Sequence, residues 1–217
     1  MGNRRPWNCF VGLVAVTGFL IGIVADLHLL RLVTKPIPVL LMALAVFSST
    51  GSVAGRRTFW GLLFCALGDV LLEVSPATFT PGLGAFLVGH LFYTSAFLAR
   101  SRTPHLGLLP IFLLWGAGVV VHLHNGLATA GMLGPVVLYS LAISAMMWRA
   151  AACWAEAPRS SASRFGFFGA VLFAVSDTLI ALNRFGDPID GAPYAIILLY
   201  WAGQMGITLS ALQQEDG

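Results

Sequence analysis

The chain has 217 residues, of which 58% are hydrophobic and only 10% are charged, and its mean hydropathy is +0.85. A soluble domain carries about 25% charged residues, so this composition excludes an ordinary soluble protein and indicates an integral membrane protein. The 12 basic residues only slightly outnumber the 9 acidic ones. We interpret the excess as loop charge that sets membrane orientation, and we predict no binding of nucleic acid.

Eight apolar segments follow one another along the chain, separated by joints rich in proline, glycine and charged residues. Each is compatible with a helix that crosses the hydrocarbon core, which needs about 20 mostly apolar residues. The predicted spans are Trp7–Ala25, Pro36–Thr50, Thr58–Val74, Pro81–Ala99, His105–Val121, Gly131–Cys153, Arg164–Leu182 and Pro193–Leu212. The second is the shortest and could begin before Lys35. We therefore predict an all-α fold, a single transmembrane domain over residues 1–217 built as a bundle of eight helices.

Basic residues fall unevenly on the two sides that these spans define. Because Lys and Arg gather in cytoplasmic loops, the richer side indicates the cytoplasm and both termini are predicted to lie there. That side carries Arg4, Arg5, Arg56, Arg57, Arg100, Arg102, Arg149, Arg159 and Arg164, and the other carries Arg31, Lys35 and Arg184.

The third and seventh spans resemble each other. Gly61–Leu72, "GLLFCALGDVLL", aligns with Gly169–Ile180, "GAVLFAVSDTLI", without a gap, and the alignment matches Gly with Gly and Asp69 with Asp177. Two segments four spans apart run in the same direction, which favours two four-helix halves in parallel repeat. A chance match between two apolar helices is the alternative.

Two carboxylates within these spans are the strongest functional candidates. A charged side chain at the bilayer centre costs roughly 2.5–3.5 kcal/mol, so it usually faces the bundle interior and serves a function. At about 1.5 Å per helical residue, Asp69, Asp177 and His90 fall in one layer. Tyr93, Tyr200 and Gln204 lie within a turn or two of that layer. The alternative is a structural role, with each Asp a protonated strut between helices and His90 its hydrogen-bond partner.

Metal and cofactor sites are not indicated. Cys9, Cys65 and Cys153 have no paired spacing, and His122 and His124 have no carboxylate or Cys nearby in sequence. We predict no metal and no cofactor.

Five blocks of the sequence are distinctive in their order and spacing: "TKPIPVLL" (34–41), "ALGDVLL" (66–72), "GLGAFLVGHLFYTSAF" (82–97), "GAVLFAVSDTLIALNRF" (169–185) and "LYWAGQMGITLSAL" (199–212). With these blocks the chain resembles the YhhN-like lysoplasmalogenase family of multi-pass membrane enzymes. The C-terminal block carries Gly203 where the resemblance leads us to expect Ala.

The resemblance implies hydrolysis of the vinyl-ether bond of lysoplasmalogens, which releases a fatty aldehyde and glycerophosphocholine or glycerophosphoethanolamine. It implies an acidic pair, Asp69 and Asp177, surrounded by Lys35, His90, Tyr93, Asn183, Tyr200 and Gln204. The partners would be the lysophospholipid substrate and the membrane lipids, in a bacterial inner membrane or an endoplasmic reticulum membrane.

Vinyl ethers hydrolyse through a proton added to carbon, so one carboxylic acid and one carboxylate suit the reaction, as in glycoside hydrolysis. We expect His90 to tune the pair or relay a proton. We expect Lys35 with Arg184, with Arg31 as a further candidate, to receive the phosphate at the non-cytoplasmic mouth. The rival functions are a proton-coupled transporter of lipids or small molecules and an intramembrane aspartyl protease. The sequence does not assign the acid between the two Asp residues, and it leaves the oligomeric state open.

Overall fold

The computed structural model describes residues 4–213, and in this part of the chain all regular secondary structure is helical. The helices are α1 (Arg4–Val24), α2 (His28–Thr34), α3 (Ile37–Ser49), α4 (Val53–Val74), η1 (Pro76–Thr78), α5 (Phe79–Arg100), η2 (Leu106–Leu108), α6 (Leu109–His122), α7 (His124–Thr129), α8 (Leu133–Glu156), α9 (Ser161–Phe185) and α10 (Ala192–Leu212). The all-α fold class is thereby confirmed.

Helix ends follow local sequence chemistry. Ser52 caps α4 because its hydroxyl accepts a hydrogen bond from the backbone N–H of Gly55 at 2.9 Å, and Ser160 caps α9 in the same way. Proline occupies the first turn of α3, α6 and α10, where its missing N–H is not needed. Gly191 precedes α10 with a φ of 73°, a left-handed conformation that glycine adopts without strain.

Five helical segments are long and apolar enough to cross a membrane: His28–Ser49, Pro76–Arg100, Leu133–Glu156, Ser161–Phe185 and Ala192–Leu212. Together with the membrane-like composition they mark an integral membrane protein. The first of them joins α2 to α3, in keeping with a second span that begins before Lys35. These five segments do not establish the predicted count of eight transmembrane helices.

The other three predicted spans also coincide with helices. Cys9–Val24 and Leu106–His122 are shorter apolar helices. The third span lies within α4, whose 22 residues include Arg56, Arg57, Asp69 and Glu73. The short helices α2 and α7 were not predicted as separate elements, since six or seven residues are too few to show a helical period.

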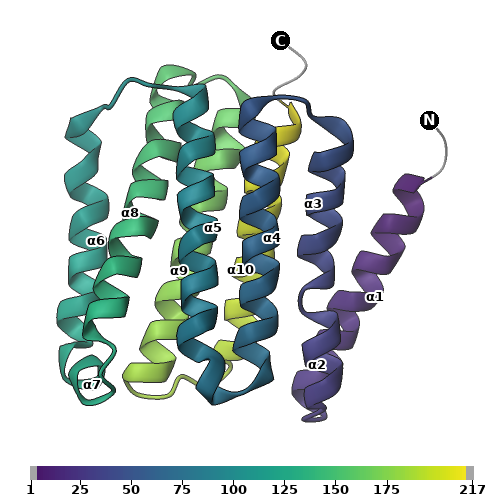
Figure 1. Ribbon diagram of the computed structural model, residues 1–217, viewed down its shortest axis with the longest axis vertical. Helices are drawn as coiled ribbons and strands as arrows, with labels where there is room; N and C mark the ends of the chain where they lie inside the picture. The colour runs from purple at the N-terminus through teal and green to yellow at the C-terminus, as the bar shows by residue number, and fades with distance from the viewer. Residues whose placement is uncertain (1–3, 214–217) are drawn as a thin grey trace.

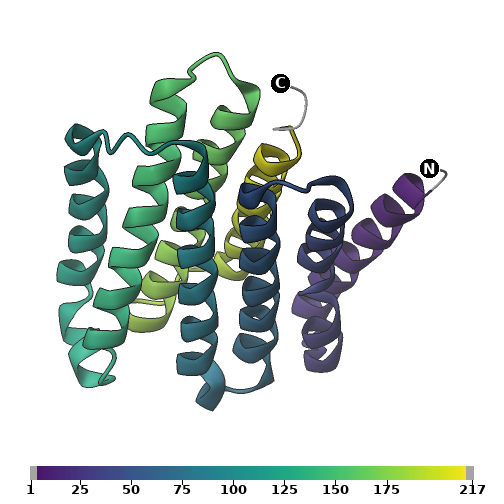
Figure 2. The same ribbon diagram turned by 45° about the horizontal axis from the view of Figure 1, so that its top comes forward.

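Six of the helices form a closed ring. Each of α3, α4, α5, α8, α9 and α10 packs against the next, and α10 packs back onto α3. Helix α1 lies outside α3, and α6 lies outside α8. Figure 2 shows α9 and α10 behind α4 and α5, so the ring has two layers. The first turn of α1 and the last turn of α10 lie at the same end of the bundle, opposite α2 and α7 (Figure 1).

Candidate functional site

The two carboxylates predicted to lie within the membrane belong to different halves of the ring, Asp69 on α4 and Asp177 on α9. Each accepts a hydrogen bond from its own tyrosine. The Tyr200 hydroxyl donates to Asp69 Oδ2 at 2.7 Å, and the Tyr139 hydroxyl donates to Asp177 Oδ2 at 2.5 Å. Asp69 is 1% exposed, whereas 11% of the Asp177 side chain is accessible. The two acids lie close enough for the charge of one to act on the other.

His90 of α5 is fully buried and adjoins Asp177. Its Nδ1 lies 2.6 Å from the carbonyl oxygen of Phe86, and its Nε2 lies 3.6 Å from Asp177 Oδ2. None of the described residues forms a hydrogen bond with Nε2. The His90 ring also packs edge-on against Tyr139, with centroids 5.1 Å apart. His90, Tyr139 and Asp177 thus form one polar cluster.

An aromatic layer connects this cluster to Asp69. The Phe173 ring packs against His90 at 4.7 Å and against Tyr200 at 5.2 Å between centroids. Phe86 packs against both Phe173 and Tyr200. The site is therefore water-poor, and an electrostatic interaction inside it is stronger than in bulk water.

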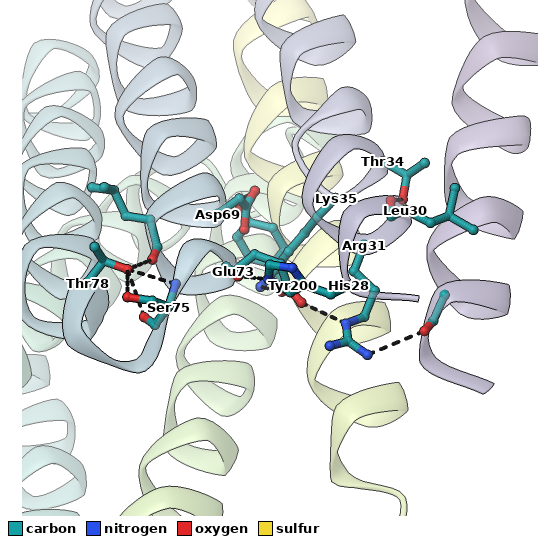
Figure 3. Close-up of polar contacts among 12 residues, drawn as sticks. His28, Leu30, Arg31, Thr34, Lys35, Asp69, Glu73, Ser75, Thr78 and Tyr200 are labelled. Carbon is teal, nitrogen blue, oxygen red and sulfur yellow. Dashed lines mark hydrogen bonds and ion pairs between the residues drawn. The ribbon is translucent and has the colours of Figure 1, made fainter. Parts of the chain in front are cut away.

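A cavity of about 370 Å³ opens at the end of the bundle opposite the termini. Three cationic side chains line it, Arg31, Lys35 and Arg184, against one carboxylate, Glu73. Glu73 bridges two of the cations, with Arg31 Nε at 2.8 Å and Lys35 Nζ at 3.1 Å. Figure 3 shows Arg31, Lys35 and Glu73 together, with Asp69 and Tyr200 next to them.

The third cation, Arg184, is held differently. Its guanidinium lies over the Phe79 ring, 3.8 Å from the centroid. Asn183, which precedes it, lines the same cavity, and its Oδ1 accepts a hydrogen bond from the backbone N–H of Ile189. Lys35, Asn183 and Arg184, which come from distant parts of the sequence, therefore meet at one mouth.

A small apolar slot of about 40 Å³ adjoins the mouth, and Leu72, Phe79 and Ile180 line both spaces. Apart from Asp177 and Tyr139, the slot is lined by apolar side chains, among them Phe86. Phe173 does not line this slot and is fully buried in the aromatic layer. Asp69 lines neither the mouth nor the slot.

Tyr93 and Gln204 lie deeper in the bundle and line neither space. The Tyr93 hydroxyl donates to Gln204 Oε1 at 2.6 Å, and both residues are fully buried. The Tyr93 ring fits against Gly61, where a Cβ atom would lie 2.3 Å from the ring. In the structure these two residues bind each other behind the layer that holds the acids.

Two residues of the site were not singled out from the sequence. Tyr139 lies in an apolar span, and the same polar-in-apolar signal that marked Tyr93 and Tyr200 could have marked it. Glu73 lies near the end of a predicted span, and its side chain is only 14% exposed and paired with two cations. Its position one helical turn after Asp69 was the available signal. The described residues contain no cluster of three or more His, Cys, Asp or Glu side chains that could hold a metal ion.

Fold and site together define a polytopic helical membrane protein whose buried carboxylates lie beside a cationic mouth and an apolar slot. The chain belongs to the YhhN family, whose model matches residues 30–211. This confirms the resemblance seen in the sequence.

Three relatives illustrate the similarity. The chain is 36% identical over 180 residues to lysoplasmalogenase TMEM86B of Homo sapiens, covering 82% of this chain and 74% of that protein. It is 33% identical to lysoplasmalogenase TMEM86A of Bos taurus, with 75% and 68% covered. It is also 33% identical to a lysoplasmalogenase of Mycobacterium tuberculosis, with 76% and 65% covered. No solved structure matches the chain.

Proposed function

We propose that the chain is a lysoplasmalogenase, which hydrolyses the vinyl-ether bond of a lysoplasmalogen to a fatty aldehyde and a glycerophospho-alcohol carrying choline or ethanolamine. Relatives that bear the name lysoplasmalogenase support an ether-bond hydrolase. The observation that carries the proposal is the placement of two carboxylates beside the junction of a cationic mouth and an apolar slot.

The substrate has a shape that suits this junction. Its phosphate would lie at the mouth, where Lys35, Arg31 and Arg184 supply positive charge and Asn183 a polar amide. Its hydrocarbon chain would enter the slot beside Phe86. Because the vinyl-ether bond joins the glycerol to the first two carbons of the chain, it would lie where mouth and slot meet. Asp69 and Asp177 precede Leu72 and Ile180, which line that junction, by one helical turn each.

The chemistry requires one proton and one water molecule. A carboxylic acid adds its proton to the β-carbon of the vinyl ether, and an oxocarbenium ion forms at the carbon bonded to oxygen. A carboxylate stabilises that cation and accepts a proton from the water that adds to it. The resulting hemiacetal loses the glycerol oxygen as an alcohol, which takes up a proton, and the aldehyde is left. The carboxylic acid is regenerated, so no cofactor is needed in this scheme.

The remaining residues of the site would support the acids. Tyr200 orients Asp69, and Tyr139 orients Asp177, through the two hydrogen bonds described above. Tyr93 and Gln204 would fix the helices behind them instead of contacting the lipid.

Asp69→Asn and Asp177→Asn test the proposal directly. Asn keeps the size of the side chain and can still accept the tyrosine hydrogen bond, so the fold should persist in detergent. Each variant should lose aldehyde release from a lysoplasmalogen by about 10²–10⁴-fold. Asp187→Asn, on the exposed loop after α9, is the matched control and should retain wild-type turnover. Near-normal turnover by both buried variants would exclude an aspartate pair.

A proton-coupled transporter is the second candidate, because the helices of the first half of the chain make the same contacts within the ring as the helices of the second half. The contact of α5 with α8 corresponds to that of α10 with α3, and α4 with α5 corresponds to α9 with α10. We infer from this that the halves form a parallel repeat, a plan that some transporters use. A transporter would release no aldehyde from lysoplasmalogen mixed with purified protein in detergent, where no gradient exists.

A further inference from the structure

We propose that Asp177, and not Asp69, is the proton donor of the reaction, and that it shares its proton with Nε2 of His90. This inference rests on the proposed function, since it assigns separate roles to the two acids. His90 is then a positioning residue, which acts on the substrate only through Asp177.

The hydrogen bonds of His90 fix where its own protons can be. Nδ1 lies 2.6 Å from the carbonyl oxygen of Phe86, and a carbonyl can only accept, so Nδ1 must carry a hydrogen. In a neutral ring Nε2 is therefore an acceptor, and it faces Asp177 Oδ2 at 3.6 Å. Two lone pairs would repel each other there, so this pair is stable only with a proton between them. Contraction by a few tenths of an ångström makes that contact a hydrogen bond.

Access to the slot distinguishes the two acids. Asp177 lines the slot, and its side chain is 11% exposed. Asp69 lines neither space and is almost fully covered. A general acid donates to carbon most directly when its carboxyl lies within hydrogen-bond reach of that carbon. Of the two acids, Asp177 is the one that lines the slot.

The charges around the two acids also favour Asp177 as the proton donor. The positive charge of Lys35 acts on Asp69 and stabilises a negative charge there, as the carboxylate of this mechanism requires, while the carboxylate of Glu73, which pairs with Lys35, opposes it. The titratable groups that face Asp177 are His90 from α5, Tyr139 from α8, and Asp69 and Cys65 from α4. Helix α10 presents Tyr200, which binds Asp69. Thus no cation other than a protonated His90 faces Asp177 within the described part of the chain.

The step balances as follows. The Asp177 carboxyl gives its proton to the β-carbon, where a new C–H bond forms from the electrons of the double bond. Asp177 is left as a carboxylate, and positive charge appears at the carbon–oxygen unit. Water adds to that carbon and passes a proton to Asp69. The glycerol oxygen takes up a proton as its bond to carbon breaks, and the hydroxyl proton of the hemiacetal returns to the Asp177–His90 pair.

The pH profile of kcat in detergent tests the assignment. A donor must be protonated, so activity is present at low pH and is lost as pH rises through an alkaline limb. The residual activity of Asp69→Asn should keep this limb, and that of Asp177→Asn should lack it. His90→Gln should move the limb to lower pH, because the pair retains the shared proton to a higher pH than the carboxylate does alone. His122→Gln, on an exposed helix end, is the matched control and should leave the limb in place.

The opposite pattern, with the limb kept in Asp177→Asn and lost in Asp69→Asn, would overturn the assignment and leave the aspartate pair intact. An unmoved limb in His90→Gln would overturn the shared proton. If neither buried Asp variant loses activity, the proposed function itself is wrong, so the failures are distinguishable.

A spectroscopic measurement needs no turnover. The protein has five histidines, and ¹⁵N spectra of labelled protein in detergent identify His90 by the signal missing from His90→Gln. We expect Nδ1 to carry a hydrogen and the Nε2 signal to shift in Asp177→Leu but not in Asp187→Leu. A neutral ring with its hydrogen on Nε2 would overturn the proposal, and so would an Nε2 chemical shift that does not change in Asp177→Leu.

Discussion

Glu73 illustrates how one side chain sets the charge of the mouth. It lies one helical turn after Asp69 and pairs with Arg31 and Lys35, while its carbonyl oxygen lies 2.5 Å from His28 Nε2. With Arg184 included, three cations face Glu73 and Asp26, whose Oδ1 lies 2.9 Å from the Arg31 guanidinium, so a surplus of one positive charge remains for a phosphate. Glu73 therefore both holds two cations in place and limits the negative charge that a head group can bring.

Glu73→Gln should change which head group is preferred. The amide keeps the size of the side chain but removes a negative charge, so the mouth attracts anions more strongly. At about 8 Å and an effective dielectric of about 20, one charge changes an interaction by about 2 kcal/mol. Turnover of a lysoplasmalogen with a net negative head group should thus improve about 30-fold relative to the choline form, measured as kcat/KM. Glu156→Gln at the other end of the bundle is the control, and an unchanged ratio in Glu73→Gln would contradict this account.

At the scale of elements, the contact between α9 and α10 depends on glycine. A Cβ atom on Gly169 would lie 2.7 Å from the backbone nitrogen of Ile207 and 2.8 Å from the backbone oxygen of Gly203. Backbone atoms cannot rotate aside as a side chain can, and small residues let membrane helices approach closely. Gly203 lies in the same contact, which gives a physical reason for glycine where the family resemblance suggested alanine.

Gly169→Ala should therefore destabilise the protein by about 1–3 kcal/mol, the usual range for overpacking. Gly118→Ala is the matched control, since a Cβ atom there would meet nothing within 4 Å and alanine favours a helix by up to about 1 kcal/mol. Thermal unfolding in detergent should show a lower midpoint for Gly169→Ala and an equal or higher one for Gly118→Ala. Equal midpoints for both variants would mean that the contact is looser than the structure indicates.

Apolar length and joint composition were enough to predict a helix in each of the eight places, because both signals are local in sequence. Helical rise alone predicted one common layer for Asp69, Asp177 and His90, and the distance of 3.6 Å between His90 Nε2 and Asp177 Oδ2 agrees with it for two of the three. The contacts of these residues could not be predicted in this way. The Tyr200–Asp69 hydrogen bond joins residues 131 positions apart, and the Tyr139–Asp177 hydrogen bond joins residues 38 positions apart. Which tyrosine faces which acid depends on the order of helices around the ring, and no local pattern contains that order.

For the whole molecule, the two ends of the bundle differ in the use of basic residues. At the end that holds the termini, several arginines tie helix ends together: Arg149 donates to the carbonyl oxygens of Ser101 and Thr103, and Arg57 donates to that of Ser95. Arg149 is only 1% exposed, so it contributes to packing more than to surface charge. The side chains of Arg4 and Arg5 lie outside what the structure describes. At the opposite end, Arg31, Lys35 and Arg184 line the mouth.

This asymmetry predicts that the mouth opens away from the cytoplasm, because the arginine-rich end should stay inside. Single cysteines at the exposed positions Arg102 and Asp187, in a background without Cys9, Cys65 and Cys153, would test it. In intact cells that carry the protein in the membrane enclosing the cytoplasm, a membrane-impermeant maleimide should label Asp187→Cys. It should label Arg102→Cys only after permeabilisation. The reverse pattern would place the mouth inside, and substrate would then have to come from the cytoplasmic leaflet.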